Sequence, residues 1–370
     1  MEQKIFQSYE QLRSCINKQG ISKVFLICGN TSFRYNREKL ERLLENIHYE
    51  RFSGFSPNPT TESLKDAIQI FRADEYEMIL AVGGGSAMDI AKCVKLYGGY
   101  DISGWSSLSE IPSEAMVSVP FVAIPTTAGS GSEATRFAVV YEDGVKQSVT
   151  SDAIIPNIVL FDHSGLESVS DYQKKSALLD ALCHSIESYW SVHSTEESQC
   201  YSQDAIAIIL KNSQSYLDGD SRTFPEIQKA AYTAGRAINI TQTTAAHAMS
   251  YKLTGLYGIA HGHAAAICLN ELWPWMIEHI DQCLDQRGKE YLMGVFDNLG
   301  AVFGAENSMA GAQMFSDFLH SLRLDLLPVQ EKDIGFLVKS VNPIRLSNHP
   351  IQLKSADIED LYCKMKKVDL

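Results

Sequence analysis

Several features that would direct the chain to other classes of protein are missing from its 370 residues. The eight cysteines include no CxxC pair, so a thiolate zinc site is not expected, and scattered thiols are typical of a reducing cytoplasm. No apolar run approaches the roughly 18 residues that a membrane span needs. The start of the sequence, MEQKIFQSYEQLRSC, lacks the apolar core of a signal peptide. We therefore expect a cytoplasmic protein.

An excess of positive charge is also missing. The chain has 32 Lys+Arg against 45 Asp+Glu, which gives a formal net charge of −13. Nucleic acids and anionic membranes select basic surfaces, so neither is expected as a partner. A local basic pocket for a small anion remains compatible with this balance. Hydrophobic residues at 45% and charged residues at 21% are ordinary for a globular protein of this length, which allows two domains.

A phosphate-binding loop is indicated by the stretch MILAVGGGSAMDIAK. An apolar strand, Met78 to Val82, runs into Gly83-Gly84-Gly85-Ser86 and then an Ala-rich helix. Glycines let the backbone approach a ligand, and a helix N-terminus offers free N–H groups to a phosphate. The loop is neither GxGxxG nor a P-loop. A tight turn with no ligand is the alternative, but three consecutive glycines favour phosphate binding.

Similar apolar runs recur through the first part of the chain. Residues 119–127 precede a second small-residue loop, AGSGSEAT, and residues 23–28 end at Gly29 and Asn30. Further strands are predicted at 49–54 and 158–161, with helices at 36–48 and 61–73. Alternating strands and helices predict a doubly wound, mostly parallel α/β domain over residues 1–165, which would bind ligands at the carboxyl ends of its strands.

The remaining residues, 166–370, predict an all-helical domain. Strand-like runs disappear and helical periodicity takes over. The expected helices span residues 171–192, 200–217, 226–241, 243–254, 261–281, 288–303, 306–322, 331–340 and 356–367.

Two histidines in this second part suggest a metal site. His247 and His261 are fourteen residues apart, and Gly255 and Gly258 between them favour two helices joined by a turn. Both histidines lie in apolar stretches of the sequence, where a buried imidazole needs a polar partner. A metal ion and a backbone carbonyl are both possible partners.

A second pair supports the metal. Asp180 and His184, at i and i+4, lie on one face of an apolar helix, although a local Asp–His hydrogen bond is the simpler alternative. Together with His247 and His261 they offer one oxygen and three nitrogen ligands, which suit Fe²⁺ or Zn²⁺. His263 is expected near the site but not as a ligand. Tyr251, one turn after His247, would donate a hydrogen bond to a substrate or simply pack.

The combined motifs resemble the iron-containing (group III) alcohol dehydrogenase family along nearly the whole chain. GGGSAMDIAK resembles the family's pyrophosphate loop, PTTAGSGSEAT its second cofactor loop, and Asp180, His184, His247 and His261 its metal ligands. The resemblance implies a dinucleotide domain, a helical domain and a site between them, with NAD(P)-dependent interconversion of an aldehyde and an alcohol. The metal would act as a Lewis acid. The implied cofactor-binding residues are Gly29, Asn30, Gly83, Gly84, Gly85, Ser86, Asp89, Thr126, Thr127, Ser130, Ser132 and Lys146.

The chain departs from the family pattern at two places. Many members carry a histidine where this chain has Tyr251, so the proton relay would pass to Tyr251 or His263. Members that prefer NAD often carry an Asp after the first strand, whereas this chain has Gly29 and Asn30. A carboxylate there would repel a 2′-phosphate, so its absence predicts a preference for NADP(H) over NAD(H).

Several stretches, among them FSGFSPNP and GSEATRFAVVYEDGVKQSVT, are similar to the family's phosphonoacetaldehyde reductase branch. That resemblance implies reduction of phosphonoacetaldehyde to 2-hydroxyethylphosphonate and a cation for the phosphonate. Arg136 is the candidate, and Lys146 could instead contact a cofactor phosphate. The alternatives are a general, sulfo- or carboxy-aldehyde reductase, a sugar-phosphate cyclase, or a non-catalytic metal-binding protein. A homo-oligomer, specifically a dimer, is expected.

Overall fold

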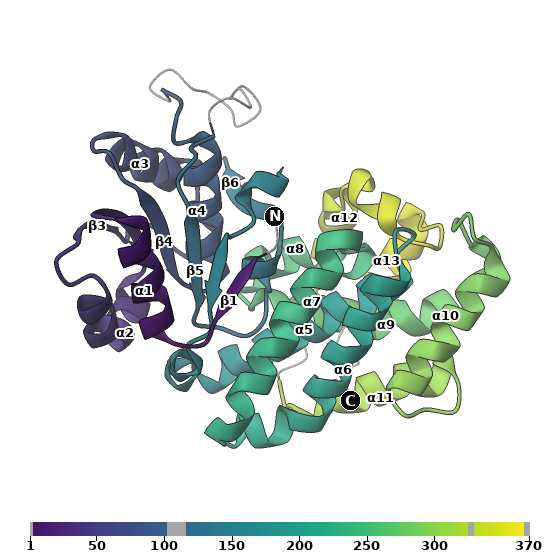
Figure 1. The fold of residues 1–370 in the computed structure, drawn as a ribbon. Helices are drawn as coiled ribbons and strands as arrows, with labels where there is room; N and C mark the ends of the chain where they lie inside the picture. The colour runs from purple at the N-terminus through teal and green to yellow at the C-terminus, as the bar shows by residue number, and fades with distance from the viewer. Residues whose placement is uncertain (1–2, 102–115, 325–328, 366–370) are drawn as a thin grey trace. The chain divides into compact units, whose positions relative to one another are not determined.

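The computed structural model describes residues 3–101, 116–324 and 329–365. The chain divides into two compact units, Met1–Val169 and Ser170–Leu370 (Figure 1). No helix among the described residues is long and apolar enough to cross a membrane.

A six-stranded parallel sheet forms the centre of the first unit. Its strand order is β1-β8-β5-β4-β2-β3. The strands are β1 (Lys4–Phe6), β2 (Lys23–Cys28), β3 (His48–Phe52), β4 (Met78–Gly83), β5 (Phe121–Pro125) and β8 (Ile158–Leu160). The chain order reverses between β2 and β4, which is where doubly wound sheets bind nucleotides. The predicted fold class is confirmed.

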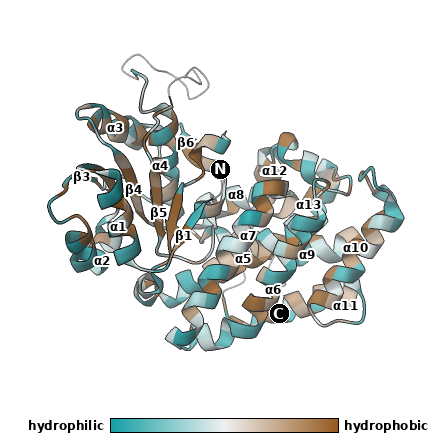
Figure 2. Ribbon diagram, viewed as in Figure 1, coloured by the Kyte–Doolittle hydropathy of each residue, from teal (hydrophilic) through white to brown (hydrophobic). Residues whose placement is uncertain are grey.

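Helices cover both faces of this sheet and create two hydrophobic cores (Figure 1). The helices are α1 (Tyr9–Gln19), α2 (Asn30–Leu43), α3 (Thr61–Arg72) and α4 (Gly85–Tyr97). Along β2, Leu26 packs with α1 and α2, whereas Phe25 packs with α3 and α4. Burial on both faces explains why the strands are continuously apolar rather than alternating, as β4 and β5 show in Figure 2.

Part of this unit differs from the predicted elements. The hairpin of β6 (Phe137–Glu142) and β7 (Val145–Thr150) was not predicted, nor were β1 and α1. The strand β6 alternates buried and half-buried positions, and β7 is mostly exposed or half-buried, so neither is continuously buried like the sheet strands. The prediction of a helix at 36–48 was wrong at both ends. The helix α2 begins at Asn30, directly after β2, and ends at Leu43.

The second unit is built from helices and has no strand longer than a single bridge among its described residues, in agreement with the prediction. Its α-helices are α5 (Asp171–Trp190), α6 (Glu196–Leu217), α7 (Phe224–Thr241), α8 (Ala245–Tyr257), α9 (His261–Glu278), α10 (Lys289–Val302), α11 (Ser308–Ser321), α12 (Glu331–Ser340) and α13 (Ser355–Lys364). The helix α5 packs against α6, α7 and α9, so its residues are almost continuously buried from Leu178 to Trp190 (Figure 1).

A turn separates the two histidine-bearing helices, as the glycines predicted. The helix α8 ends at Tyr257, and Gly258 adopts a left-handed conformation with φ 68°. Glycine is the residue that tolerates this conformation at a helix end. The helix α9 begins at His261, which therefore occupies its first position.

Candidate functional site

Three predicted ligands come together in the second unit. Asp180 of α5, His247 of α8 and His261 of α9 each offer a ligand atom, and these atoms all lie within 4.8 Å of one another. Asp180 and His247 are buried, and His261 is half-buried. One carboxylate oxygen with two imidazole nitrogens is a donor set that Fe²⁺ and Zn²⁺ accept.

The donor atoms of Asp180 and His247 face each other directly. The carboxylate Oδ1 of Asp180 lies 3.5 Å from Nε2 of His247, and both atoms are buried without a hydrogen-bond partner among the described residues. Two such atoms at this distance are costly unless something else satisfies them. A cation bound between them would do so, and the residues present therefore fit a divalent metal.

His184, the fourth predicted ligand, lies beside this group without belonging to it. Its Nε2 is 3.8 Å from Oδ1 of Asp180. Its ring stacks on that of His247 with centroids 4.6 Å apart and an interplanar angle of 14°. His184 therefore borders the cluster, and its role as a ligand stays a prediction.

Glu187 holds His247 from the other side, and sequence reasoning missed it. Its fully buried carboxylate accepts a hydrogen bond from Nδ1 of His247 and from the hydroxyl and the backbone N–H of Thr244, the last two at 2.7 and 3.0 Å. This contact leaves Nε2 of His247 for the cluster. A carboxylate on the second nitrogen is the usual support of a metal-binding histidine. The available signal was the spacing, because Glu187 follows Asp180 by two helical turns.

The charges around the cluster favour a cation. Burial alone would raise the pKa of Asp180, but the charge of His184 and the close contact with His247 hold this pKa below its usual range. Burial would likewise lower the pKa of His247, yet Glu187 and Asp180 raise it to about 10. Two buried carboxylates therefore give this region a negative potential.

His263, two residues after His261, contacts Tyr172 of α5. Its Nδ1 is 3.3 Å from the Tyr172 hydroxyl, and its backbone N–H donates to Ser176 at 3.2 Å. The same hydroxyl accepts a hydrogen bond from the backbone N–H of Ala260 at 2.8 Å. Tyr172 therefore fixes the start of α9, and with it the position of His261.

Tyr251 stacks on His261. The two rings are nearly parallel, with centroids 5.4 Å apart and an interplanar angle of 11°. The Tyr251 hydroxyl accepts a hydrogen bond from Nη1 of Arg345 at 3.2 Å, and the guanidinium carbon of Arg345 lies 4.9 Å from the centre of the Tyr251 ring. Arg345 was not predicted from the sequence, because it lies 94 residues after Tyr251 in a stretch without a motif.

In the first unit, the predicted cofactor loops meet at one edge of the sheet. The strands β2, β4 and β5 are adjacent and parallel, so the residues after them share the carboxyl edge. Gly84 is the N-cap of α4 and provides no side-chain cap, which leaves the first N–H groups of this helix for a ligand. The hydroxyls of Ser32 and Thr126 lie 3.5 Å apart and bridge α2 and the second loop.

The glycines after β4 press against the loop after β5. A Cβ atom at Gly84 would lie 3.1 Å from Oγ1 of Thr127, and one at Gly85 would lie 3.4 Å from Oγ of Ser130. A Cβ atom on Gly84 would therefore crowd the neighbouring loop, and one on Gly85 would touch it at an ordinary contact distance. The two loops that the sequence predicted separately are packed together.

A buried lysine ties these loops together. Nζ of Lys92, which is fully buried, donates hydrogen bonds to Ser132 at 3.1 Å, to Thr135 at 3.0 Å and to the carbonyl of Phe137 at 2.6 Å. Burial lowers the pKa of Lys92 to about 8 and raises that of Asp89 to about 6. Sequence reasoning assigned Lys92 no role, although the residue closes the GGGSAMDIAK motif.

Asn30 has a cationic neighbour. Arg51, at the end of β3, donates from Nη2 to Oδ1 of Asn30 at 3.0 Å and from Nη1 to the carbonyl of Cys28 at 3.4 Å. Its guanidinium carbon lies 4.4 Å from the centre of the Phe33 ring. A guanidinium is therefore held beside the turn where the adenosine ribose was predicted to bind.

The predicted anion-binding residues Arg136 and Lys146 lie on or next to the β6–β7 hairpin. Nη1 of Arg136 is 3.2 Å from the exposed carboxylate of Asp152. Lys146 is half-buried and pairs with Tyr141 in the hairpin register. Burial raises the pKa of Asp89, and the positive charge of Lys146 lowers it by a smaller amount. Lys146 therefore lies near Asp89 in the first turns of α4.

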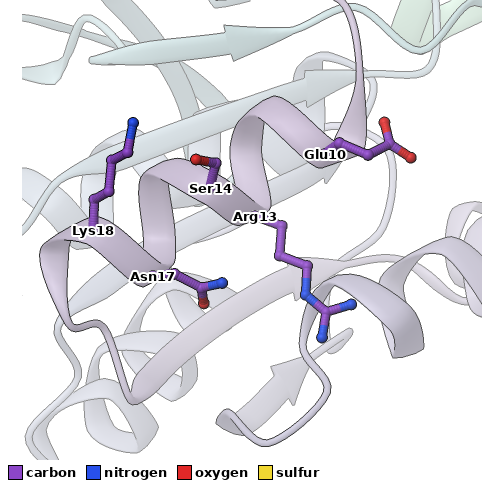
Figure 3. Close-up of a pocket in the computed structure, with 5 residues that line it drawn as sticks. All are labelled: Glu10, Arg13, Ser14, Asn17 and Lys18. Atoms are coloured by element: carbon purple, nitrogen blue, oxygen red, sulfur yellow. The ribbon is translucent and has the colours of Figure 1, made fainter.

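A hollow on the first unit lies outside these sites. Its five lining side chains come from one face of α1 (Figure 3): Glu10, Arg13, Ser14, Asn17 and Lys18. No predicted site residue lines it. We assign this hollow no function.

Comparison with known families covers both units. The family model described as iron-containing alcohol dehydrogenase matches residues 4–163. The family model for the C-terminal part of the Fe-containing alcohol dehydrogenase family matches residues 175–365.

Individual relatives agree with these matches. The phosphonoacetaldehyde reductase of Streptomyces viridochromogenes is 31% identical over 270 residues, which cover 69% of this chain and 68% of that protein. The iron-containing alcohol dehydrogenase of Thermotoga maritima is 26% identical, with a TM-score of 0.83 over 100% of this chain and 99% of that chain. The sulfoacetaldehyde reductase of Bifidobacterium kashiwanohense, solved with NAD⁺, shares the fold at 22% identity, with a TM-score of 0.86 over 99% of this chain and 98% of that chain.

Proposed function

Since family models match both of its units, the chain belongs to the iron-containing alcohol dehydrogenase family, and we propose that it reduces phosphonoacetaldehyde to 2-hydroxyethylphosphonate with NADPH. It is an oxidoreductase. The observation that carries the proposed chemistry is the buried group of Asp180, His247 and His261, whose ligand atoms lie within 4.8 Å of one another.

Asp180, His247 and His261 would hold the metal, with His184 as the fourth ligand. A divalent metal bound there would polarise the aldehyde oxygen as a Lewis acid, and NADPH would supply the hydride. The chain's own contribution is to orient these groups. Glu187 holds Nδ1 of His247, and Tyr172 holds the first turn of α9 through the N–H of Ala260.

The reaction also needs a proton for the alcohol oxygen, and we assign its delivery to His263. Nδ1 of His263 contacts the Tyr172 hydroxyl at 3.3 Å. Because that hydroxyl already accepts the N–H of Ala260, its own proton is available to Nδ1. His263 and Tyr172 would then form a two-residue path for the proton, in place of the histidine that many family members carry at the position of Tyr251.

A preference for NADP(H) is supported at the carboxyl end of β2. The residues there, Gly29 and Asn30, carry no carboxylate that would repel a 2′-phosphate. Arg51 adds a cation whose Nη2 reaches Asn30 at 3.0 Å. A guanidinium binds phosphate through paired hydrogen bonds, so this arrangement suits the 2′-phosphate better than a free ribose hydroxyl.

The phosphonate substrate is supported by the relative from Streptomyces viridochromogenes and by the sequence stretches shared with that branch. At 31% identity, reductases of sulfo-, carboxy- or neutral aldehydes are the competing possibilities.

An aldehyde panel tests the proposed function. Iron-loaded protein would be assayed with NADPH and with NADH on phosphonoacetaldehyde, sulfoacetaldehyde, succinic semialdehyde and butanal, with a chelator-treated sample as control. We expect the highest kcat/KM for phosphonoacetaldehyde with NADPH, and a rate that the chelator abolishes. Equal efficiency with NADH would overturn the cofactor assignment. A maximum with butanal would overturn the substrate, and no oxidation of either nucleotide would overturn the reductase itself.

A further inference from the structure

An arginine beside the metal cluster has no acidic partner. Arg345 lies in the short 3-10 helix η8 (Pro343–Asn348), which packs against α8. It is half-buried, and no carboxylate pairs with it among residues 3–101, 116–324 and 329–365. Arg287 differs, because its guanidinium is paired with Asp285 at 2.7 Å.

The position of Arg345 relative to the cluster is fixed through one aromatic ring. Nη1 of Arg345 donates to the Tyr251 hydroxyl at 3.2 Å, and the Tyr251 ring stacks on the His261 ring at 5.4 Å. His261 is itself one of the three clustered ligands. Tyr251 therefore contacts both the guanidinium of Arg345 and one of the clustered ligands, which places Arg345 one residue away from the cluster.

The guanidinium also retains donors for a ligand. A guanidinium carries five N–H groups in a planar fork, and the Tyr251 hydroxyl takes one of them. A cation that is partly removed from water and lacks a counter-ion favours an anion that can accept two parallel hydrogen bonds. Phosphonate, sulfonate and carboxylate groups all have this geometry.

We propose that Arg345 binds the anionic group of the substrate, and that the enzyme is built for short aldehydes carrying a phosphonate, sulfonate or carboxylate at the end opposite the carbonyl. This inference rests on the proposed aldehyde reduction at the Asp180–His247–His261 cluster. The carbonyl end would lie at the cluster and the anion at Arg345. Of the three anions, the dianionic phosphonate gains most from the cation.

The same geometry gives Tyr251 a role. Its hydroxyl accepts the hydrogen bond of Arg345 and its ring lies against His261, so it sets the spacing between anion site and cluster. Tyr251 is then a positioning residue, and the proton need not pass through it. A histidine at this position could not offer the same hydroxyl acceptor to the guanidinium.

Arg136, the anion site predicted from the sequence, is less suited to this task. Its guanidinium is 3.2 Å from the carboxylate of Asp152, so a substrate anion would have to compete with an existing partner. Arg345 and Arg136 are therefore alternative anchors, and a single pair of variants distinguishes them.

The test compares Arg345→Ala with Arg136→Ala on a charged and a neutral aldehyde. For Arg345→Ala we expect kcat/KM for phosphonoacetaldehyde to fall about 100-fold, mainly through KM, while butanal changes less than about threefold. Arg345→Lys should recover part of the loss, because it keeps the charge without the planar fork. An equal loss on both aldehydes, or a selective loss in Arg136→Ala alone, would overturn the assignment to Arg345.

Arg236→Ala is the matched control. Arg236 also lies over a tyrosine, with its guanidinium carbon 4.1 Å from the centre of the Tyr201 ring, but Arg236 is exposed and has an acidic neighbour in Glu197. Its removal should leave both aldehydes unaffected. If kcat/KM for phosphonoacetaldehyde fell selectively in this variant, removal of any positive charge would be enough to cause the loss. That result would overturn the proposal.

A binding measurement separates this inference from the proposed function. Calorimetric titration of metal-loaded protein with 2-hydroxyethylphosphonate should give an affinity about 100-fold weaker in Arg345→Ala than in the wild type, with thermal unfolding confirming that both are folded. If no aldehyde is reduced but this difference is found, the reductase fails and the anion site stands. If aldehydes are reduced and both proteins bind the phosphonate equally, the anion site fails and the reductase stands.

Discussion

Single side chains decide how the histidines of the cluster are presented. His247 is held by Glu187 at Nδ1, and this contact leaves Nε2 directed at Asp180. Because the carboxylate of Glu187 is fully buried, it depends on Thr244 and His247 for its hydrogen bonds.

We predict that Glu187→Gln weakens metal binding about 10- to 100-fold, since an amide cannot fix the histidine as a carboxylate does. The measurement is metal content after equilibration with Fe²⁺ or Zn²⁺ in a competing chelator. The control is Glu278→Gln, which removes an exposed carboxylate at the end of α9. Unchanged metal affinity in Glu187→Gln would show that Glu187 only fills space.

Arg51 makes the cofactor preference testable in the same way. We predict that Arg51→Ala raises the dissociation constant of NADPH about 10- to 100-fold and leaves that of NADH nearly unchanged, because only NADPH carries the 2′-phosphate. Fluorescence titration of the reduced nucleotides measures both constants. Arg42→Ala, which removes an exposed cation from the last turn of the same helix as Asn30, should change neither. Equal weakening of NADH would place Arg51 away from the 2′-phosphate.

The metal ligands could be predicted from the sequence, but the residues that hold the sites in place could not. Asp180, His247 and His261 could be predicted because imidazoles and a carboxylate in apolar helices need partners. Glu187, Lys92 and Arg345 could not be assigned roles, because their importance comes from tertiary contacts with residues 60, 40 and 94 positions away in the chain. Spacing along one helix does not reveal such contacts.

At the level of elements, the cluster depends on a close approach of α9 to α5. Gly262 follows His261, and a Cβ atom there would lie 2.1 Å from the carbonyl oxygen of Ser176 and 2.6 Å from Cβ of Asp180. Only glycine fits at this crossing, so it sets the distance between the helices that carry Asp180 and His261.

We predict that Gly262→Ala lowers the free energy of unfolding by about 1–3 kcal/mol or more and reduces metal content, because the backbone of α5 or α9 must move. Denaturant unfolding and metal analysis measure the two effects. Gly294→Ala is the control, because a Cβ atom at this position inside α10 would have no neighbour within 4 Å among the described residues. That change should be neutral or stabilise by up to about 1 kcal/mol. Similar behaviour of the two variants would contradict the close approach.

Helices and strands could be predicted where the sequence follows a single hydrophobic pattern, either a continuous apolar run or helical periodicity. Buried strands such as β2 and long helices such as α5 matched their predicted ranges closely. The hairpin β6–β7 was missed, because its strands are only partly buried and β6 packs on α4 through contacts that are distant in the sequence. The prediction of α2 started too late, because the polar residues after Gly29 carry no apolar periodicity.

At the level of the whole molecule, a buried acid makes stability depend on pH. Glu133 is 3% exposed, and burial raises its pKa from 4.5 to about 7. The folded state therefore binds a proton more tightly than the unfolded state. This contribution to stability is complete below about pH 4.5 and is lost as the pH rises to about 7.

We predict that Glu133→Gln removes this dependence. Relative to the wild type, the variant should gain on the order of 3 kcal/mol in stability between about pH 4.5 and pH 7, given 1.36 kcal/mol per pKa unit for a shift from 4.5 to about 7. Urea unfolding at both pH values measures the difference. Parallel pH profiles of the two proteins would show that Glu133 does not titrate in this range.

The most direct measurement is the metal content and aldehyde reduction of Asp180→Asn beside the wild type, after anaerobic loading with Fe²⁺. We predict one equivalent of metal per wild-type chain and NADPH-dependent reduction of phosphonoacetaldehyde. In the variant, the metal should be lost and the rate should fall at least about 100-fold, while NADPH affinity is unchanged. A variant that keeps its metal and its rate would contradict the assignment of the cluster as the catalytic metal site.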